Sequence, residues 1–134
     1  MASHSRYRAG ARSAEWMLRE FHELIPPAAP AVPTATISDE VRELRKRLIL
    51  DEVEELLAAI DAGDLAGIAK EGPDAVYTII GTVVAFGLPW DRLFAAVHAE
   101  NMTKDPGADG KAVKGPRFQP ADITGIIEEA IARA

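Results

Sequence analysis

The sequence predicts an all-α fold, a helical bundle of four to five helices in a single domain. Apolar residues recur every three or four positions along most of the chain, which is the spacing of one helix face. Clusters of proline and glycine interrupt this spacing and separate the helices. Only 6% of the 134 residues are aromatic, although 48% are hydrophobic. Alanine and aliphatic side chains therefore fill the interior, which favours packed helices.

Residues 1–12 combine arginine with small polar residues without periodicity, which predicts a flexible N-terminal arm before a domain over 13–134. The first helix is expected over 13–25, with Ser13 as its N-cap. Four prolines between positions 26 and 33 then impose an extended connection. Proline fixes its own backbone and displaces the preceding residue from the helical region.

A long second helix is expected from its cap, Ser38, to about Ala62. Gly63 ends it and Asp64 begins the next helix, and so short a connection makes consecutive helices antiparallel neighbours. The apolar run 75–86 is rich in β-branched residues and allows a strand. It exceeds the usual strand length and continues a helical segment, so a buried helix is preferred.

Pro89 stands at the expected start of a fourth helix that reaches Asn101. Residues 102–119 are dense in glycine, proline and cations, which predicts a loop. Pro120 and Asp122 then begin a terminal helix.

Two acidic clusters are the most informative chemical feature of the chain. Asp51, Glu52 and Glu55 project within about one turn of each other on the second helix. Glu71 and Asp74 repeat this spacing on the third. Carboxylates held together repel one another and take up protons unless a divalent cation that prefers oxygen ligands, such as Mg²⁺, neutralises them. The sequence therefore predicts a metal site between the two helices.

From about Trp16 to Ile123 the chain resembles the all-α nucleoside triphosphate pyrophosphohydrolases of the MazG-like and phosphoribosyl-ATP pyrophosphohydrolase superfamily. The motifs "DEVEE" and "EGPD" match its two acidic motifs, and Phe21 with His22 matches a pair in its first helix. The segments "VHAENMTK" and "DGKAVKGPRFQP" match the region after its fourth helix. The resemblance implies cleavage between the α and β phosphates, Mg²⁺ as cofactor with Mn²⁺ as a possible substitute, and a bundle completed in a homodimer or a dimer of dimers.

The resemblance also implies which residues form the site. The implied metal ligands are Asp51, Glu52, Glu55, Glu71 and Asp74. Glu52 or Glu55 is the candidate general base. The candidate substrate-binding residues are Asn101, Lys104, Lys111, Lys114, Arg117 and Phe21. The alternative for each cation is ordinary surface charge, for Asn101 a helix cap, and for Phe21 a place in the core. A histidine such as His22 is more often structural than a ligand.

Two departures from the family pattern affect this prediction. Asp51 stands in place of the usual glutamate, and its shorter side chain suits contact through water or support of the other ligands. Gly72 and Pro73 lie inside the third helix. Because proline removes an amide donor and crowds the carbonyl four residues back, a kink or restart is expected there, which would re-aim Glu71.

Composition limits the classes of partner. Without cysteine the chain has no disulfide and no thiolate zinc site. A net charge of -6, from 15 basic and 21 acidic residues, disfavours general attraction to nucleic acid. The longest apolar run is far shorter than the roughly 20 residues of a membrane span, and residues 1–13 lack an apolar signal core. We expect a cytoplasmic protein with no nucleic-acid or membrane partner.

The predicted function is house-cleaning hydrolysis of non-standard or excess nucleoside triphosphates. Two alternatives stay open. The acidic residues also permit hydrolysis of phosphoribosyl-ATP in histidine biosynthesis. The second alternative is a non-catalytic helical interaction module. Under that alternative, the departures at Asp51 and Gly72–Pro73 are signs of lost catalysis.

Overall fold

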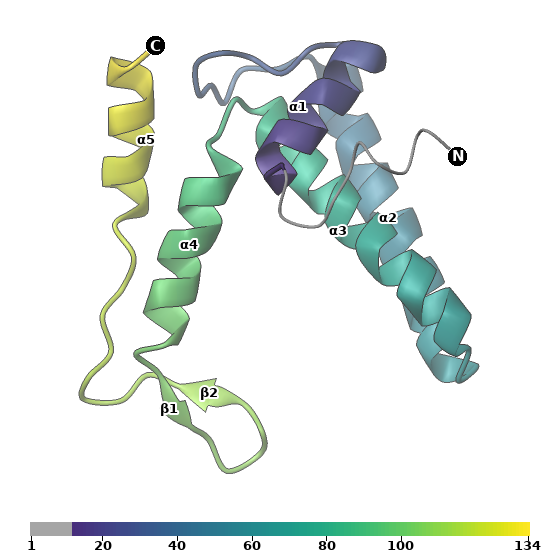
Figure 1. Ribbon diagram of the computed structural model, residues 1–134, viewed down its shortest axis with the longest axis vertical. Coiled ribbons are helices and arrows are strands. Elements are labelled where there is room, and N and C mark those ends of the chain that lie inside the picture. The colour runs from purple at the N-terminus through teal and green to yellow at the C-terminus, as the bar shows by residue number, and fades with distance from the viewer. Residues whose placement is uncertain (1–11) are drawn as a thin grey trace.

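The computed structural model describes residues 12–134, which form five helices and one short hairpin (Figure 1). The helices are α1 (Ala14–Leu24), α2 (Asp39–Asp61), α3 (Leu65–Ala85), α4 (Trp90–Asn101) and α5 (Ile123–Ala132). The strands are β1 (Asp105–Pro106) and β2 (Ala112–Val113). The prediction of an all-α bundle is confirmed. The predicted N-terminal arm, residues 1–12, lies outside the described residues except for Arg12.

Four of the helices begin at a side-chain cap. Ser13, Ser38, Asp64 and Asp122 each accept a hydrogen bond from the backbone N–H three residues further on. These bonds satisfy donors that have no partner inside the helix, and they confirm the helix starts expected from the sequence. Pro89 immediately precedes α4 and makes no side-chain cap.

α3 is one unbroken helix with Pro73 inside it, so the restart expected at Gly72–Pro73 is wrong. The missing N–H of Pro73 leaves the carbonyl of Ala69 without its usual helical donor. Both residues are exposed, so water can reach that carbonyl and the helix continues. The apolar run 75–86 is helical as preferred, with Ala75, Ile80 and Val84 buried.

α2 and α3 run antiparallel and pack against each other, and α1 lies across α3 (Figure 1). Gly63 makes the tight reversal between α2 and α3 because its φ of 63° lies in the left-handed region that glycine adopts without strain. The core contains Leu18 of α1 with Ile80 and Val84 of α3. This antiparallel packing places the middle of α2 beside the first half of α3, where the two acidic clusters lie.

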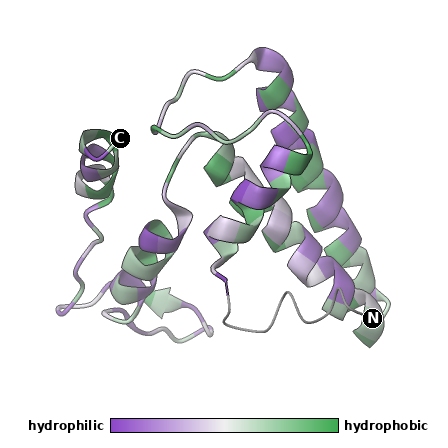
Figure 2. Ribbon diagram, turned by 45° about the horizontal axis from the view of Figure 1, so that its top comes forward, coloured by the Kyte–Doolittle hydropathy of each residue, from purple (hydrophilic) through white to green (hydrophobic). Residues whose placement is uncertain are grey.

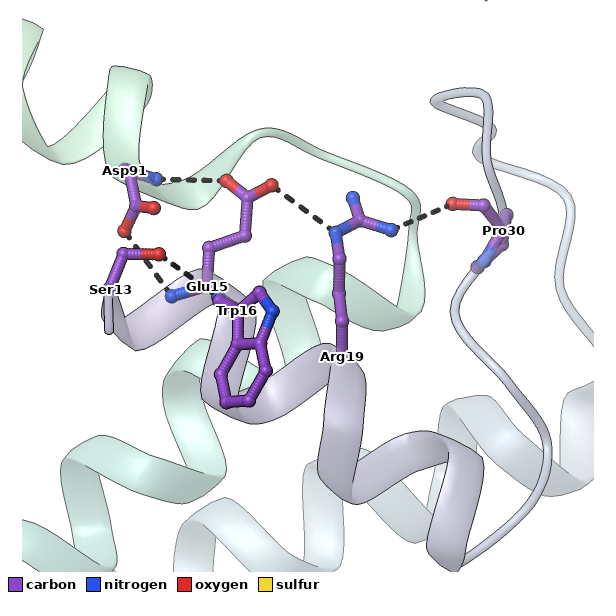
Figure 3. A network of polar contacts seen from close by, with 6 residues as sticks. All are labelled: Ser13, Glu15, Trp16, Arg19, Pro30 and Asp91. Atoms are coloured by element: carbon purple, nitrogen blue, oxygen red, sulfur yellow. Dashed lines mark hydrogen bonds and ion pairs between the residues drawn. The ribbon is translucent and has the colours of Figure 1, made fainter. Parts of the chain in front are cut away.

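A polar network joins the start of α1 to the start of α4 (Figure 3). The Glu15 N–H donates to Asp91 Oδ1 at 3.2 Å, and the Asp91 N–H donates to Glu15 Oε1 at 3.1 Å. Arg19 pairs with Glu15 Oε2 at 3.2 Å and donates to the carbonyl of Pro30 at 3.3 Å. These contacts fix where α4 and the proline-rich connection leave the three-helix body.

Residues 90–134 form a C-terminal arm that extends away from α2 and α3 (Figures 1 and 2). Within it, Arg92 of α4 pairs with Glu129 of α5 at 2.6 Å. The sequence analysis missed the hairpin, in which β1 and β2 pair antiparallel. Strands of two residues carry no alternating pattern that a sequence could show.

Among residues 12–134, no single helix has the length and apolar composition to cross a bilayer. Only α3 and α4 together pass that test, as a pair bent by 114°.

Candidate active site

Three glutamates from two helices meet at the centre of the α2–α3 pair. Glu52 and Glu55 lie one turn apart on α2, and Glu71 faces them from α3. Each offers a carboxylate oxygen, and these oxygens all lie within 4.8 Å of one another. The structure therefore brings together three of the five predicted metal ligands, and the proline after Glu71 does not turn its side chain away.

The chemistry of this cluster fits a cation. Glu52 Oε2 and Glu71 Oε2 are buried and have no hydrogen-bond donor among residues 12–134. Burying a carboxylate oxygen without a hydrogen-bond partner costs free energy, so a buried oxygen of this kind usually has a partner such as a bound ion. Burial, a hydrogen bond shared with Glu55 and the charges of Glu55 and Asp74 raise the pKa of Glu71. A hard cation relieves this repulsion and supplies the missing partner for both oxygens.

The other two predicted ligands lie outside this group of three. Asp51 is exposed on α2. The carboxylate of Asp74 accepts a hydrogen bond from Lys70, one turn earlier on α3. That bond raises the pKa of Lys70, and it occupies one of the two carboxylate oxygens of Asp74. Their role as ligands stays a prediction.

A pocket of about 350 Å³ opens beside the cluster. All three helices of the body line it: Phe21 and His22 from α1, Arg45 and Glu52 from α2, Asp74 and Tyr77 from α3. The Phe21 and Tyr77 rings meet edge to face, with 5.3 Å between their centroids. Phe21, predicted to bind substrate, thus lies in the same pocket wall as two of the acids.

The sequence analysis gave no role to Arg45 and read His22 as structural, yet both line this pocket. Arg45 Nε donates to Thr82 Oγ1 at 3.0 Å, and Nη2 donates to the Thr78 carbonyl at 2.8 Å. A Cβ on Gly81 would lie 2.6 Å from Arg45 Nη2 and 3.2 Å from His22 Nε2. A glycine within an apolar helix was the one available signal, because glycine there often marks a close approach.

The remaining predicted substrate-binding residues lie on the C-terminal arm: Asn101, Lys104, Lys111, Lys114 and Arg117. None of them lines the pocket of about 350 Å³. Arg117 pairs with Asp105 at 3.0 Å, and Lys114 Nζ lies 5.0 Å from the centroid of the Phe118 ring. The chain leaves α3 at its far end from Glu71 and the arm extends away from α2 and α3 (Figure 1). Within one chain, the structure does not bring these residues to the acids.

Comparison with known proteins supports the chemistry that the site suggests. Residues 18–101 match the family model described as phosphoribosyl-ATP pyrophosphohydrolase. The matched segment includes all five predicted metal ligands and Phe21. No curated protein matches the chain in sequence.

The matched segment covers more than half of the chain, and the carboxylates it contains suit the metal dependence of such enzymes. The protein therefore belongs to the phosphoribosyl-ATP pyrophosphohydrolase family, within the MazG-like all-α superfamily, and is a pyrophosphohydrolase that acts on phosphoanhydride bonds of a nucleotide.

Proposed function

We propose that the protein is a Mg²⁺-dependent nucleoside triphosphate pyrophosphohydrolase that releases a nucleoside monophosphate and pyrophosphate. The observation that carries this proposal is the meeting of Glu52, Glu55 and Glu71 at the edge of a pocket with aromatic walls. A triphosphate carries several negative charges and would be repelled by these acids without a cation between them. Mn²⁺ is expected to replace Mg²⁺ because it also prefers oxygen ligands.

In this proposal the three glutamates have different roles. Glu52 and Glu71, whose buried oxygens lack donors, hold the cation. A bound divalent cation neutralises phosphate charge and lowers the pKa of an attacking water. Glu55 is exposed, so water can reach its carboxylate, and we assign to it the proton of that water. The water oxygen forms a bond to one of the two phosphorus atoms of the α–β linkage as the bridging P–O bond breaks. The electron pair of the broken bond leaves with the product on the other side of that linkage, so that the two products are the nucleoside monophosphate and pyrophosphate.

The substrate is proposed to be a non-standard or excess nucleoside triphosphate, which makes the protein a house-cleaning enzyme. Its support is the loop after α4, which resembles MazG-like members and lies outside the matched segment 18–101. The second candidate is phosphoribosyl-ATP, which the description of the matched family favours. The non-catalytic alternative is not retained, because α3 continues through Pro73 and Glu71 keeps its place beside Glu52 and Glu55.

We further propose that two copies complete the bundle as a homodimer, or as a dimer of dimers, in the cytoplasm. α2 exposes Leu50, Leu57 and Ile60, which are 62%, 53% and 51% exposed, and α3 exposes Val76 at 50%. These residues are spaced for helix faces, and exposed apolar faces of this kind are typical of association surfaces. Light scattering after size exclusion should give twice or four times the mass of one chain, and Leu57→Asp should lower that mass.

Pyrophosphate release over a panel of nucleoside triphosphates and phosphoribosyl-ATP tests the function. The proposal predicts release from one or more triphosphates with Mg²⁺ or Mn²⁺, and none with a chelator. Cleavage of phosphoribosyl-ATP alone would establish the second candidate. Failure to cleave any member of the panel with either metal would contradict both.

A further inference from the structure

Arg45 is a partly buried cation without an acidic partner in the part of the chain that the structure describes. Among the described residues its hydrogen-bond partners are the Thr82 hydroxyl and the Thr78 carbonyl, and no carboxylate forms an ion pair with it. Both contacts come from one edge of the guanidinium, Nε and Nη2, which faces α3. Burial lowers the pKa of Arg45, yet an arginine remains charged in a protein. A partly buried charge of this kind is stabilised by any further hydrogen-bond acceptor that reaches it.

The other edge of Arg45 makes no hydrogen bond to any residue in the described range 12–134. A guanidinium has five N–H donors in a rigid fork, and a fork presents two parallel donors to a planar acceptor pair. With Nε and Nη2 engaged on α3, the Nη1–Nη2 edge remains, and Arg45 lines the pocket beside the acids. The absence of a side chain on Gly81 lets the guanidinium lie against α3 in this orientation.

Arg45 and Glu52 lie at different points along one pocket. Arg45 precedes Glu52 on α2 by seven residues, which is two turns or about 10 Å along a helix axis. The same pocket is lined by Phe21 and Tyr77, whose rings meet edge to face, and an aromatic wall of this kind suits a nucleobase. If the phosphates lie at the acids, a nucleoside extends along this wall and its base reaches Arg45.

We propose that Arg45 is a specificity-determining residue that selects nucleotides with a 6-oxopurine base, guanine or hypoxanthine, over adenine. This inference rests on the nucleotide substrate proposed above. The O6 and N7 atoms of such a base form a planar pair of acceptors that matches the free guanidinium edge. Adenine has an amino group in place of O6, so that a base N–H donor would face an N–H donor of the guanidinium. A cytosine amino group gives the same mismatch.

The test compares the kcat/KM ratio of GTP to ATP in the wild type, in Arg45→Met and in Arg45→Lys. We expect the wild type to favour GTP and ITP over ATP by roughly ten- to hundredfold, the worth of one bidentate contact, and both variants to bring the ratio close to one. Arg47→Met, an exposed arginine of the same helix, is the matched control and should keep the wild-type ratio. A ratio is unaffected by the folded fraction, so it remains informative if Arg45→Met destabilises the α2–α3 contact.

Two additional measurements separate the possible results. 7-Deaza-GTP lacks the N7 acceptor and should lose part of the advantage over ATP in the wild type only. Competition between GMP and AMP in binding, measured by calorimetry, tests base selection even if no triphosphate is cleaved, and so separates this inference from the proposed reaction. An unchanged GTP to ATP ratio in Arg45→Met would overturn the inference. The inference would also be overturned if Arg45→Met lowered kcat/KM for phosphoribosyl-ATP alone. Arg45 would then bind the phosphate of the added phosphoribosyl group and not a purine base.

Discussion

The α2–α3 pair and the C-terminal arm hold opposite halves of the expected nucleotide chemistry. The pair carries carboxylates that converge on one point, because two packed antiparallel helices fix the positions of their side chains. The arm carries cations on a hairpin and loop, where Arg117 pairs with a neighbour on the same arm and Lys111 and Lys114 are exposed. The carboxylates of the candidate metal site therefore meet within one chain, whereas the cations predicted to bind phosphate lie apart from them on the arm.

The largest effect is expected at the acids. Glu52→Gln and Glu55→Gln keep the side-chain shape and remove its charge, so we expect pyrophosphate release to fall by about 10²- to 10⁴-fold, the usual contribution of a catalytic acid or base. Glu54→Gln is the matched control, because Glu54 is exposed on the same helix and lies outside the cluster of three. Equal activity of all three variants would show that the cluster is not the site.

A smaller effect is expected on the arm. Replacing Lys111 and Lys114 together by alanine should raise KM by at least about tenfold, because even one hydrogen bond to a charged phosphate contributes about 1.5–3 kcal/mol. The melting temperature should be unchanged, because both side chains are exposed. Lys46→Ala, an exposed lysine of α2 paired with Glu43, serves as control. An unchanged KM in the double variant would separate the arm from substrate binding.

The caps of α3 and α5 offer a matched pair for stability. Asp64 and Asp122 each accept a hydrogen bond from a glycine N–H three residues on, at 3.0 Å in both cases. Asp64→Ala should lower the free energy of unfolding by about 1 kcal/mol, the usual worth of an N-cap. Asp122→Ala should fray α5 and change the urea midpoint much less. Equal losses would show that the arm unfolds together with the body.

The smallest effect concerns pH. Burial, followed by the charges of Arg45 and Arg19, lowers the pKa of His22 below its usual 6.5. Above pH 6.5 His22 is neutral in both the folded and the unfolded chain. As pH falls through 6.5 the unfolded chain binds the proton first, so stability decreases until the folded pKa is passed. Urea unfolding between pH 5 and 8 should show a steeper loss for the wild type than for His22→Gln, whereas His98→Gln, an exposed histidine of the arm, should follow the wild type.

The body of the fold was predictable because its signals are local. Ser13, Ser38 and Asp64 are caps whose chemistry acts within three residues, and the short turn at Gly63 fixes the antiparallel pairing of α2 and α3. The meeting of Glu52, Glu55 and Glu71 follows from that pairing.

The remainder depends on contacts that no local pattern reports. The helix continues past Pro73 because Pro73 and Ala69 are exposed and water can reach the Ala69 carbonyl, which a sequence does not show. Arg45 shares a face of α2 with Leu48 and Glu52. Its contacts are visible only when Gly81 and Thr82 of α3 are placed beside it. The course of the arm depends on the network of Glu15, Asp91 and Arg19, whose members are distant in sequence.

The central claim is that Glu52 and Glu71 hold a metal ion, with Glu55 beside them in the same cluster. Titration of Mn²⁺ into the protein without nucleotide, followed by electron paramagnetic resonance, tests it most directly, with Glu71→Gln compared to Glu54→Gln. We predict binding by the wild type and by Glu54→Gln, and binding at least roughly tenfold weaker in Glu71→Gln, because removal of a ligand costs at least as much as removal of its supporting groups. Equal Mn²⁺ affinity in both variants would contradict the claim.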